Sequence, residues 1–142
     1  MSIASVAVRS SNVTINAAQW QLLCTAGVKC RILELSYVGV TATAASVAWG
    51  RPAAAAVTPG TISTFQRDDS ADPACVTTVS LTYGTSPTNP TTPHRRWNGA
   101  ATVGVGIVFT FPRGIIIPVS GAFTAANITA GVAADHSLVI DE

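Results

Sequence analysis

The chain has 142 residues, of which 48% are hydrophobic and only 11% are charged, and its formal net charge is +1. This length fits one domain with a single core, so neither a metal nor a disulfide is needed to hold it together. The charge excludes an electrostatic grip on nucleic acid, which needs clustered basic residues, and no apolar run reaches the roughly 20 residues of a membrane span. The few charges favour contacts with other protein subunits, because hydroxyl and amide groups cost less to desolvate than ions.

Short segments with alternating apolar residues follow one another along the chain, and glycine, proline and asparagine separate them. Alternation of this kind predicts β-strands. The predicted strands cover residues 3–9, 13–24, 28–40, 46–51, 62–66, 75–83, 103–111, 115–119, 122–126 and 137–140. Strands at this spacing favour an all-β, antiparallel β-sandwich of the jelly-roll type over a helical design.

The strictest alternation runs from Val103 to Phe111, and a second apolar run covers Ile115 to Val119. Between them stands Pro112-Arg113-Gly114, whose residue types are typical of turns. We therefore expect these two runs to form a β-hairpin.

Residues 1–142 are predicted to form one sandwich domain with an N-terminal arm at 1–12 and a proline-rich loop at 84–98. Chain ends and proline-rich loops order readily on a partner's surface, so residues 86–93 are expected to lie over a neighbouring subunit. The alternative is a surface loop without a partner. The residues predicted to contact partners are Ser2, Ile3, Arg9, Ser86, Pro87, Pro90, Pro93, Arg95, Arg96 and Trp97.

The segment His94-Arg95-Arg96-Trp97 is a short basic patch beside an aromatic ring. Such a patch is able to stack a base or to hold a phosphate or a sugar. Pairing of Arg95 or Arg96 with a carboxylate of another subunit explains it equally well, because arginine and tryptophan are enriched at protein interfaces.

The three cysteines, Cys24, Cys30 and Cys75, are an odd number, which fits folding in a reducing cytosol. We interpret them as small buried hydrophobic residues. A bridge between Cys24 and Cys30 across a hairpin, formed after release into oxidising surroundings, is the alternative.

Reactive side chains form no catalytic pattern. Asp135, His136 and Ser137 are the residue types of a hydrolase triad, but neighbours on a strand point to opposite faces. The acidic cluster at residues 68–72 lacks the spacing of an EF-hand, so we prefer a solvated turn to a calcium site. The sequence predicts no enzyme, no cofactor and no metal.

A resemblance to a known family covers most of the chain. Its features are Val28 to Leu35 followed by an Ala/Thr-rich turn, Trp97 ahead of Gly106 to Ile117, and the ending Leu138 to Glu142. In their order along the chain and in their residue types, these segments resemble small structural proteins of tailed bacteriophages, above all capsid decoration, or cement, proteins. The resemblance implies a compact sandwich on the virion's outer capsid surface, made in the host cytoplasm. It also implies a homo-oligomer, commonly a trimer, that ties neighbouring subunits of the major capsid protein together.

A carbohydrate- or receptor-binding module is the competing class, because jelly rolls also serve that purpose. Trp20, Trp49 and Trp97 are candidate sugar platforms. Exposed indole rings beside polar side chains would favour glycan binding, whereas buried ones would favour a structural role. An enzyme is the third class.

Overall fold

The computed structural model describes residues 2–11, 14–25, 27–129 and 131–142, and among these residues every regular element is a strand. No helix long and apolar enough to cross a membrane is found in these ranges. The strands are β1 (Ile3–Ser10), β2 (Ala18–Leu23), β3 (Cys30–Gly39), β4 (Ala45–Gly50), β5 (Val57–Pro59), β6 (Ile62–Thr64), β7 (Gln66–Arg67), β8 (Thr78–Ser80), β9 (Tyr83–Thr85), β10 (Arg95–Gly99), β11 (Gly106–Ile117), β12 (Ala122–Asn127) and β13 (Ala134–Asp141).

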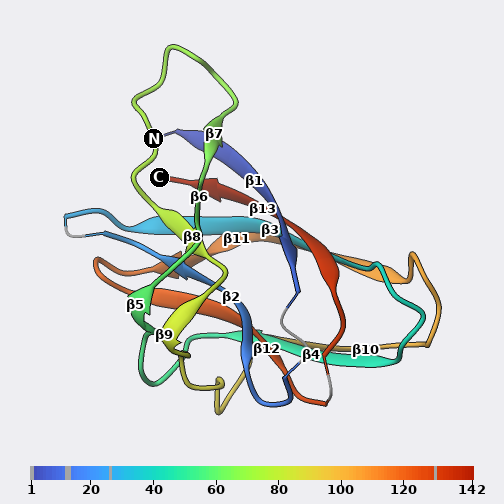
Figure 1. Cartoon of the computed structure of the whole chain (residues 1–142). Coiled ribbons are helices and arrows are strands. Elements are labelled where there is room, and N and C mark those ends of the chain that lie inside the picture. The colour runs from blue at the N-terminus through green and yellow to red at the C-terminus, as the bar shows by residue number, and fades with distance from the viewer. Residues whose placement is uncertain (1, 12–13, 26, 130) are drawn as a thin grey trace.

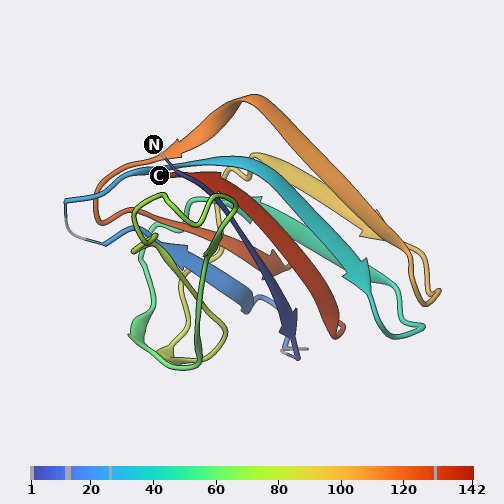
Figure 2. The same cartoon turned by 90° about the horizontal axis from the view of Figure 1, so that it is seen from above.

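Two antiparallel sheets pack face to face (Figure 1, Figure 2). Sheet A has the order β11-β3-β13-β1-β7, and sheet B has the order β10-β4-β12-β2-β8-β6. The strands β1 to β4 alternate between the sheets, and so do β10 to β13. These connections and neighbours are those of an eight-stranded jelly roll. The predicted all-β sandwich is confirmed.

The short strands β5 to β9 form an insertion between β4 and β10. Strand β7 pairs with β1 of sheet A, while β8 pairs with β2 of sheet B, and β5 pairs with β9 in a small sheet of its own. The insertion therefore covers the edges that β1 and β2 would otherwise leave open. At the other side of the sandwich, β10 and β11 remain as edge strands.

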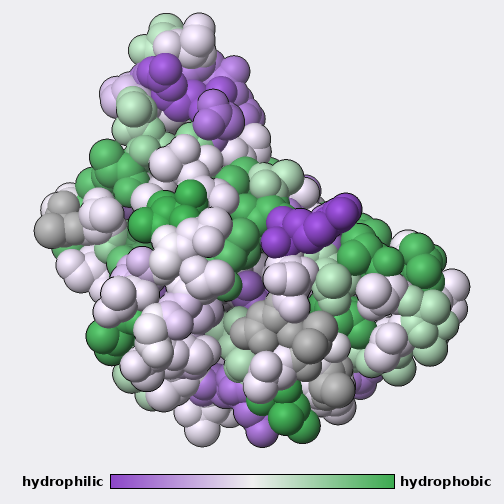
Figure 3. All heavy atoms as spheres, viewed as in Figure 1, coloured by the Kyte–Doolittle hydropathy of each residue, from purple (hydrophilic) through white to green (hydrophobic). Residues whose placement is uncertain are grey.

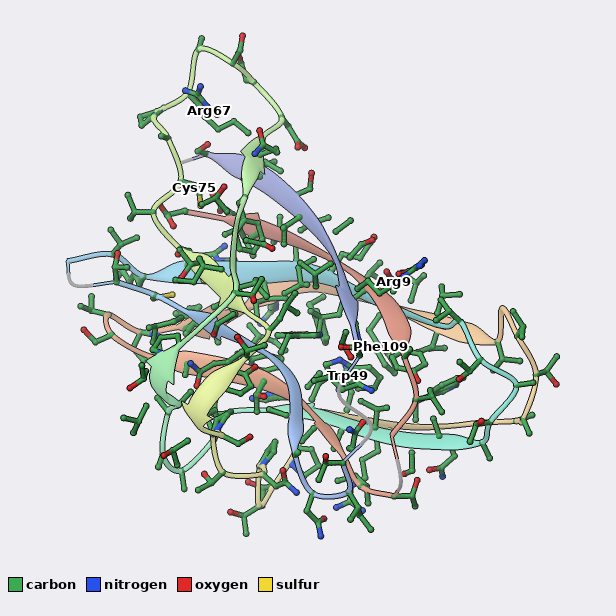
Figure 4. All side chains as sticks on the ribbon, in the orientation of Figure 1. Arg9, Trp49, Arg67, Cys75 and Phe109 are labelled. Carbon is green, nitrogen blue, oxygen red and sulfur yellow. The ribbon has the colours of Figure 1, made fainter. Side chains whose placement is uncertain are left out.

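Aromatic side chains fill the space between the sheets. The ring centroids of Trp49 and Phe109 are 5.4 Å apart, and those of Tyr37 and Trp49 are 6.1 Å apart (Figure 4). Trp20 stacks on Phe123 at 6.4 Å. Large rings in edge or stacked contact dominate the energetics of a core, so the tryptophans hold the two sheets together.

The N-terminal residues form a strand in sheet A rather than the predicted arm. Residues 3–10 pair along their whole length with β13, and Ala4, Val6 and Val8 are buried. The reason lies in their alternation, which places every second side chain in the core. The prediction of a strand at residues 3–9 was right, and the prediction of an arm at 1–12 was wrong for residues 3–10; Met1 and Asn12 lie outside the described residues.

The expected hairpin at residues 103–119 is also wrong. Gly106 to Ile117 form one strand that pairs with β3 on both sides of an irregularity between Thr110 and Ile115. Pro112-Arg113-Gly114 makes a bulge in which Gly114 has a φ of 66°, and the strand bends there (Figure 2). A turn and a bulge need the same residue types, and burial of apolar side chains on both sides of the bulge favours the continuous strand.

The proline-rich segment lies against the chain's own sheet B. Pro87 and Pro90 are buried, and the Thr88 amide donates a hydrogen bond of 3.1 Å to the Ala54 carbonyl. A Cβ atom added at Gly50 in β4 would lie 2.7 Å from Pro90 Cβ. The predicted loop at 84–98 thus packs on its own subunit, and β10 forms its last residues.

This packing predicts the effect of replacing the last residue of β4. Gly50→Ala should lower the free energy of unfolding by about 1–3 kcal/mol, since the new methyl group overlaps Pro90. Gly39 ends β3 and is the matched control, because an added Cβ there meets its nearest atom at 3.6 Å. Gly39→Ala should change the stability by less than about 0.5 kcal/mol. Urea unfolding of both variants measures the difference, and equal stabilities would contradict the packing of Pro90.

Candidate functional site

The outward side of sheet A is the most regular exposed surface of the molecule. Strand pairing aligns its outward residues in rows that run across β11, β3, β13 and β1 in turn. We call the surface made by these rows the outer A face. The rows are Gly106-Val38-Asp135-Arg9, Val108-Ser36-Ser137-Ala7, Thr110-Glu34-Val139-Ser5 and Ile116-Arg31-Asp141-Ile3.

The middle of the outer A face carries small and apolar side chains. The row that contains Val108 and Ala7 has no charged residue, and the Val108 side chain is 57% exposed. On the side of the molecule shown in Figure 3, hydrophilic residues gather over the loop that joins β7 to β8, and a separate hydrophilic group stands over β1 and β13. Depletion of charge at the centre of a patch is typical of protein interfaces.

The charges of the outer A face lie mainly in its outer rows. Arg9 donates hydrogen bonds to both carboxylate oxygens of Asp135, from Nε at 2.6 Å and from Nη2 at 2.8 Å. The hydrogen bond raises the pKa of Arg9 and lowers the pKa of Asp135. Because the pair is solvent-exposed, it adds little to stability, but it neutralises the two charges where a partner would cover them.

A shallow hollow adjoins the outer A face where the insertion meets β1. It has a volume of about 580 Å³, and hydroxyl groups dominate its polar lining. Ile62, half exposed, also lines it. The lining residues are Ser5, Val6, Ala7, Ile62, Ser63, Thr64, Gln66 and Ser137.

The ten residues predicted to contact partners do not form one surface. Ile3 and Arg9 lie on the outer A face, at opposite ends of β1. Ser2 is buried, and its amide donates a 2.7 Å hydrogen bond to the Glu142 carbonyl. The residues of the proline-rich segment, on the other sheet, are Ser86, Pro87, Pro90 and Pro93.

Arg95, Arg96 and Trp97 belong to the edge strand β10. The Arg95 guanidinium lies 5.1 Å from the ring centre of Phe111, a cation–π contact between the two edge strands. Trp97 is half-buried, and its ring lies 5.0 Å from that of Tyr37. Contacts within the chain therefore explain two of the three side chains, while Arg96 remains exposed.

The two other candidate chemical sites are structural. His136 is 1% exposed inside the sandwich, where burial lowers its pKa to about 3, and Ser137 points outward. In the acidic turn, Asp69 accepts a 2.8 Å hydrogen bond from the Ala71 amide, and Arg67 donates to the Asp72 carbonyl. Within the described residues, no group of three or more His, Cys, Asp or Glu side chains is able to hold a metal ion.

The outer A face was not predicted, because alternation identifies the residues that face the core and leaves the opposite side of each strand unassigned. Val38, Val108 and Ile116 occupy outward positions, where a surface strand normally carries polar residues. The sequence does contain a signal for this face, because these strands carry apolar residues at outward as well as inward positions.

The tryptophans provide the discriminating observation between the two leading functional classes. Trp20 is 0% and Trp49 is 1% exposed, and both indoles lie in the core. Trp97 is half-buried against Tyr37. Trp20 and Trp49 therefore offer no open ring face of the kind that stacks on sugars.

These observations leave an all-β domain whose most regular exposed surface has one uncharged, partly apolar row between rows that carry charges. Its function must be inferred from its own residues, because no protein-family model, no curated protein and no solved structure matches the chain.

Proposed function

We propose that this protein is a structural, non-enzymatic component of a virion: a capsid decoration, or cement, protein that binds the outer lattice of the major capsid protein. The outer A face is the surface proposed to make the contact. The observation that carries the proposal is the combination of this partly apolar sheet surface, whose charges lie mainly in its outer rows, with Trp20 and Trp49 packed into the core. The resemblance of the chain to tailed-phage structural proteins supports the same choice.

The composition of the outer A face suits a contact that is repeated many times over a lattice. Serine, alanine and valine lose little side-chain entropy when a partner covers them, so little of the binding free energy is spent on ordering. The strands that carry them are held in register by sheet A, and the surface is therefore rigid before it binds. Each single contact with the capsid need then be only weak, because the contact is repeated many times over the lattice.

A homo-oligomer, with a trimer favoured, is part of the proposal. Several copies of the face in one particle make the second and third contacts intramolecular, which raises their effective concentration. Symmetry also allows the oligomer to sit over a symmetric point of the lattice. Stabilisation of the capsid then follows from linking neighbouring subunits.

The proposal is tested by mixing the purified protein with undecorated capsids of candidate phages. Sedimentation equilibrium gives the oligomeric state, co-sedimentation gives the binding curve, and calorimetry gives the temperature at which the capsid opens. We expect saturable binding and a higher opening temperature. A folded protein that binds none of the capsids and leaves their opening temperature unchanged would contradict the proposal.

A carbohydrate- or receptor-binding role is the second candidate, and one observation favours it. The hollow beside the outer A face is lined by several hydroxyl groups and the Gln66 amide, which are suitable partners for a sugar. The buried tryptophans weigh against this role. A glycan-array screen distinguishes the two, because specific binding of one glycan that is lost on Gln66→Ala would support the second candidate.

A further inference from the structure

Cys24 and Cys30 lie at a junction between the two sheets. Cys24 directly follows β2 of sheet B, and Cys30 is the first residue of β3 in sheet A. Both are buried, with exposed fractions of 1% and 2%. Their Sγ atoms are 3.1 Å apart and share a hydrogen bond, although both thiols are free in this structure. A covalent bond at this point would tie sheet A to sheet B.

We propose that Cys24 and Cys30 form an oxidation site, at which a peroxide converts the two thiols into a disulfide that joins the sheets once the protein has left a reducing compartment. The sulfur atoms need to approach by only about 1 Å to reach the length of a disulfide bond. This inference does not depend on capsid binding.

A small oxidant has a route to Cys30, whose Sγ lies 3.1 Å from Cys24 Sγ. A hollow of about 200 Å³ opens beside Cys30, and it is large enough for hydrogen peroxide. Two basic side chains, Lys29 and Arg31, contribute to its wall and offer donors to a peroxide. The complete lining is Lys29, Cys30, Arg31, Ile116, Asp141 and Glu142.

The reaction has two steps. The Cys24 thiolate attacks one peroxide oxygen, the O–O bond breaks, hydroxide leaves, and the sulfur is oxidised to a sulfenic acid. The Cys30 sulfur then attacks Cys24 Sγ, and the S–S bond forms. The S–O bond of the sulfenic acid breaks, and its hydroxyl group takes up the proton of the Cys30 thiol and leaves as water. In sum, two thiols and one hydrogen peroxide give one disulfide and two waters. The hydrogen bond with Cys30 lowers the pKa of Cys24 and so favours the thiolate that the first step needs.

Cys75 provides an internal comparison. Its thiol donates a 3.1 Å hydrogen bond to Glu142 Oε2. Burial, together with this carboxylate, raises the pKa of Cys75 to about 12, so that almost none of it is thiolate at neutral pH. Oxidation should therefore select the pair and spare Cys75.

The test uses the full chain, reduced and then treated with hydrogen peroxide. Remaining thiols are alkylated, and intact mass and peptide mapping follow. We expect one alkylated residue, Cys75, a bridge between Cys24 and Cys30, and a melting temperature about 5 °C above that of the reduced protein. Cys75→Ala is the matched control and should show the same bridge and the same shift. Cys30→Ala should show neither.

Three outcomes would overturn the proposal. They are three alkylated cysteines after peroxide treatment, a bridge that contains Cys75, and equal melting temperatures for the oxidised and reduced chains. Because the mapping is done on the unmutated protein, the test holds even if Cys30→Ala folds poorly.

Discussion

Replacing Val8 by aspartate is expected to unfold the chain at room temperature, whereas Ala7→Asp, one residue away on the same strand, should leave the fold intact. Val8 is 6% exposed and stands opposite His136 on the core side of sheet A. Burying an unpaired carboxylate there costs several kcal/mol, which is comparable to the whole stability of a domain. Ala7 points to solvent on the outer A face, where a charge is hydrated.

Circular dichroism and thermal melting of the two variants measure this contrast. A truncation that removes residues 2–11 should behave like Val8→Asp, because it takes away the strand that pairs with β13. Cooperative melting of the truncated chain or of Val8→Asp near the wild-type temperature would show that β1 is not part of the core. The N-terminal segment would then be better described as the arm that the sequence predicts.

The second large effect is a loss of stability in acid that originates at His136. Burial lowers the pKa of this imidazole from 6.5 to about 3, because its neighbours in the core are the rings of Trp20 and Tyr37. Between these pH values the unfolded chain binds a proton that the folded chain does not. The free energy of unfolding should therefore fall as the pH falls, by up to roughly 1.4 kcal/mol per pH unit below pH 6.5.

Urea unfolding of wild type and His136→Phe at pH 7, 6 and 5 measures this slope. The range avoids most of the titration of Asp135 and Glu142, whose pKa values are lowered from 3.8 and 4.5. His94→Gln is the matched control, because His94 lies outside the core. We expect a steep slope in wild type, a somewhat smaller one in His94→Gln, because desolvation also lowers the pKa of His94, and the loss of most of the slope in His136→Phe. The same slope in all three proteins would show that His136 is not buried in its neutral form.

Alternation of side chains was sufficient to predict the architecture. Residues 3–9 and 122–126 were predicted as strands within one or two residues of their observed bounds, and the all-β sandwich follows from such segments. Alternation reports which residues face a core, and a sandwich leaves few other ways to bury them.

The errors arise where one pattern serves two structures. The proline and glycine around Arg113 are compatible with a turn and with a bulge, and only the pairing of Ile115 with Ile32 in β3 decides between them. Strand β10 was missed because the prolines before it are typical of a loop, although its own residues 95–99 pair with β4. Neither pairing is visible locally, since each depends on a strand far away in the chain.

Part of the candidate surface was within reach of the sequence. Ile3 and Arg9 were predicted to contact partners, and both lie on the outer A face. The rest of that face combines four strands whose order becomes known only from the fold. The proline-rich segment was chosen for its composition, but composition does not reveal that Pro87 and Pro90 are buried against the chain's own sheet.

The most direct test of the proposed contact compares two valine variants in binding to undecorated capsids. Val108 lies in the uncharged row of the outer A face and is 57% exposed, while Val57 in β5 is 59% exposed and lies in the insertion. Val108→Arg places a charge in the uncharged row of the proposed contact and should weaken co-sedimentation at least tenfold, as about 1.4 kcal/mol of desolvation suffices for that. Val57→Arg should bind like wild type. Equal binding by both variants would contradict the assignment of the outer A face as the capsid contact.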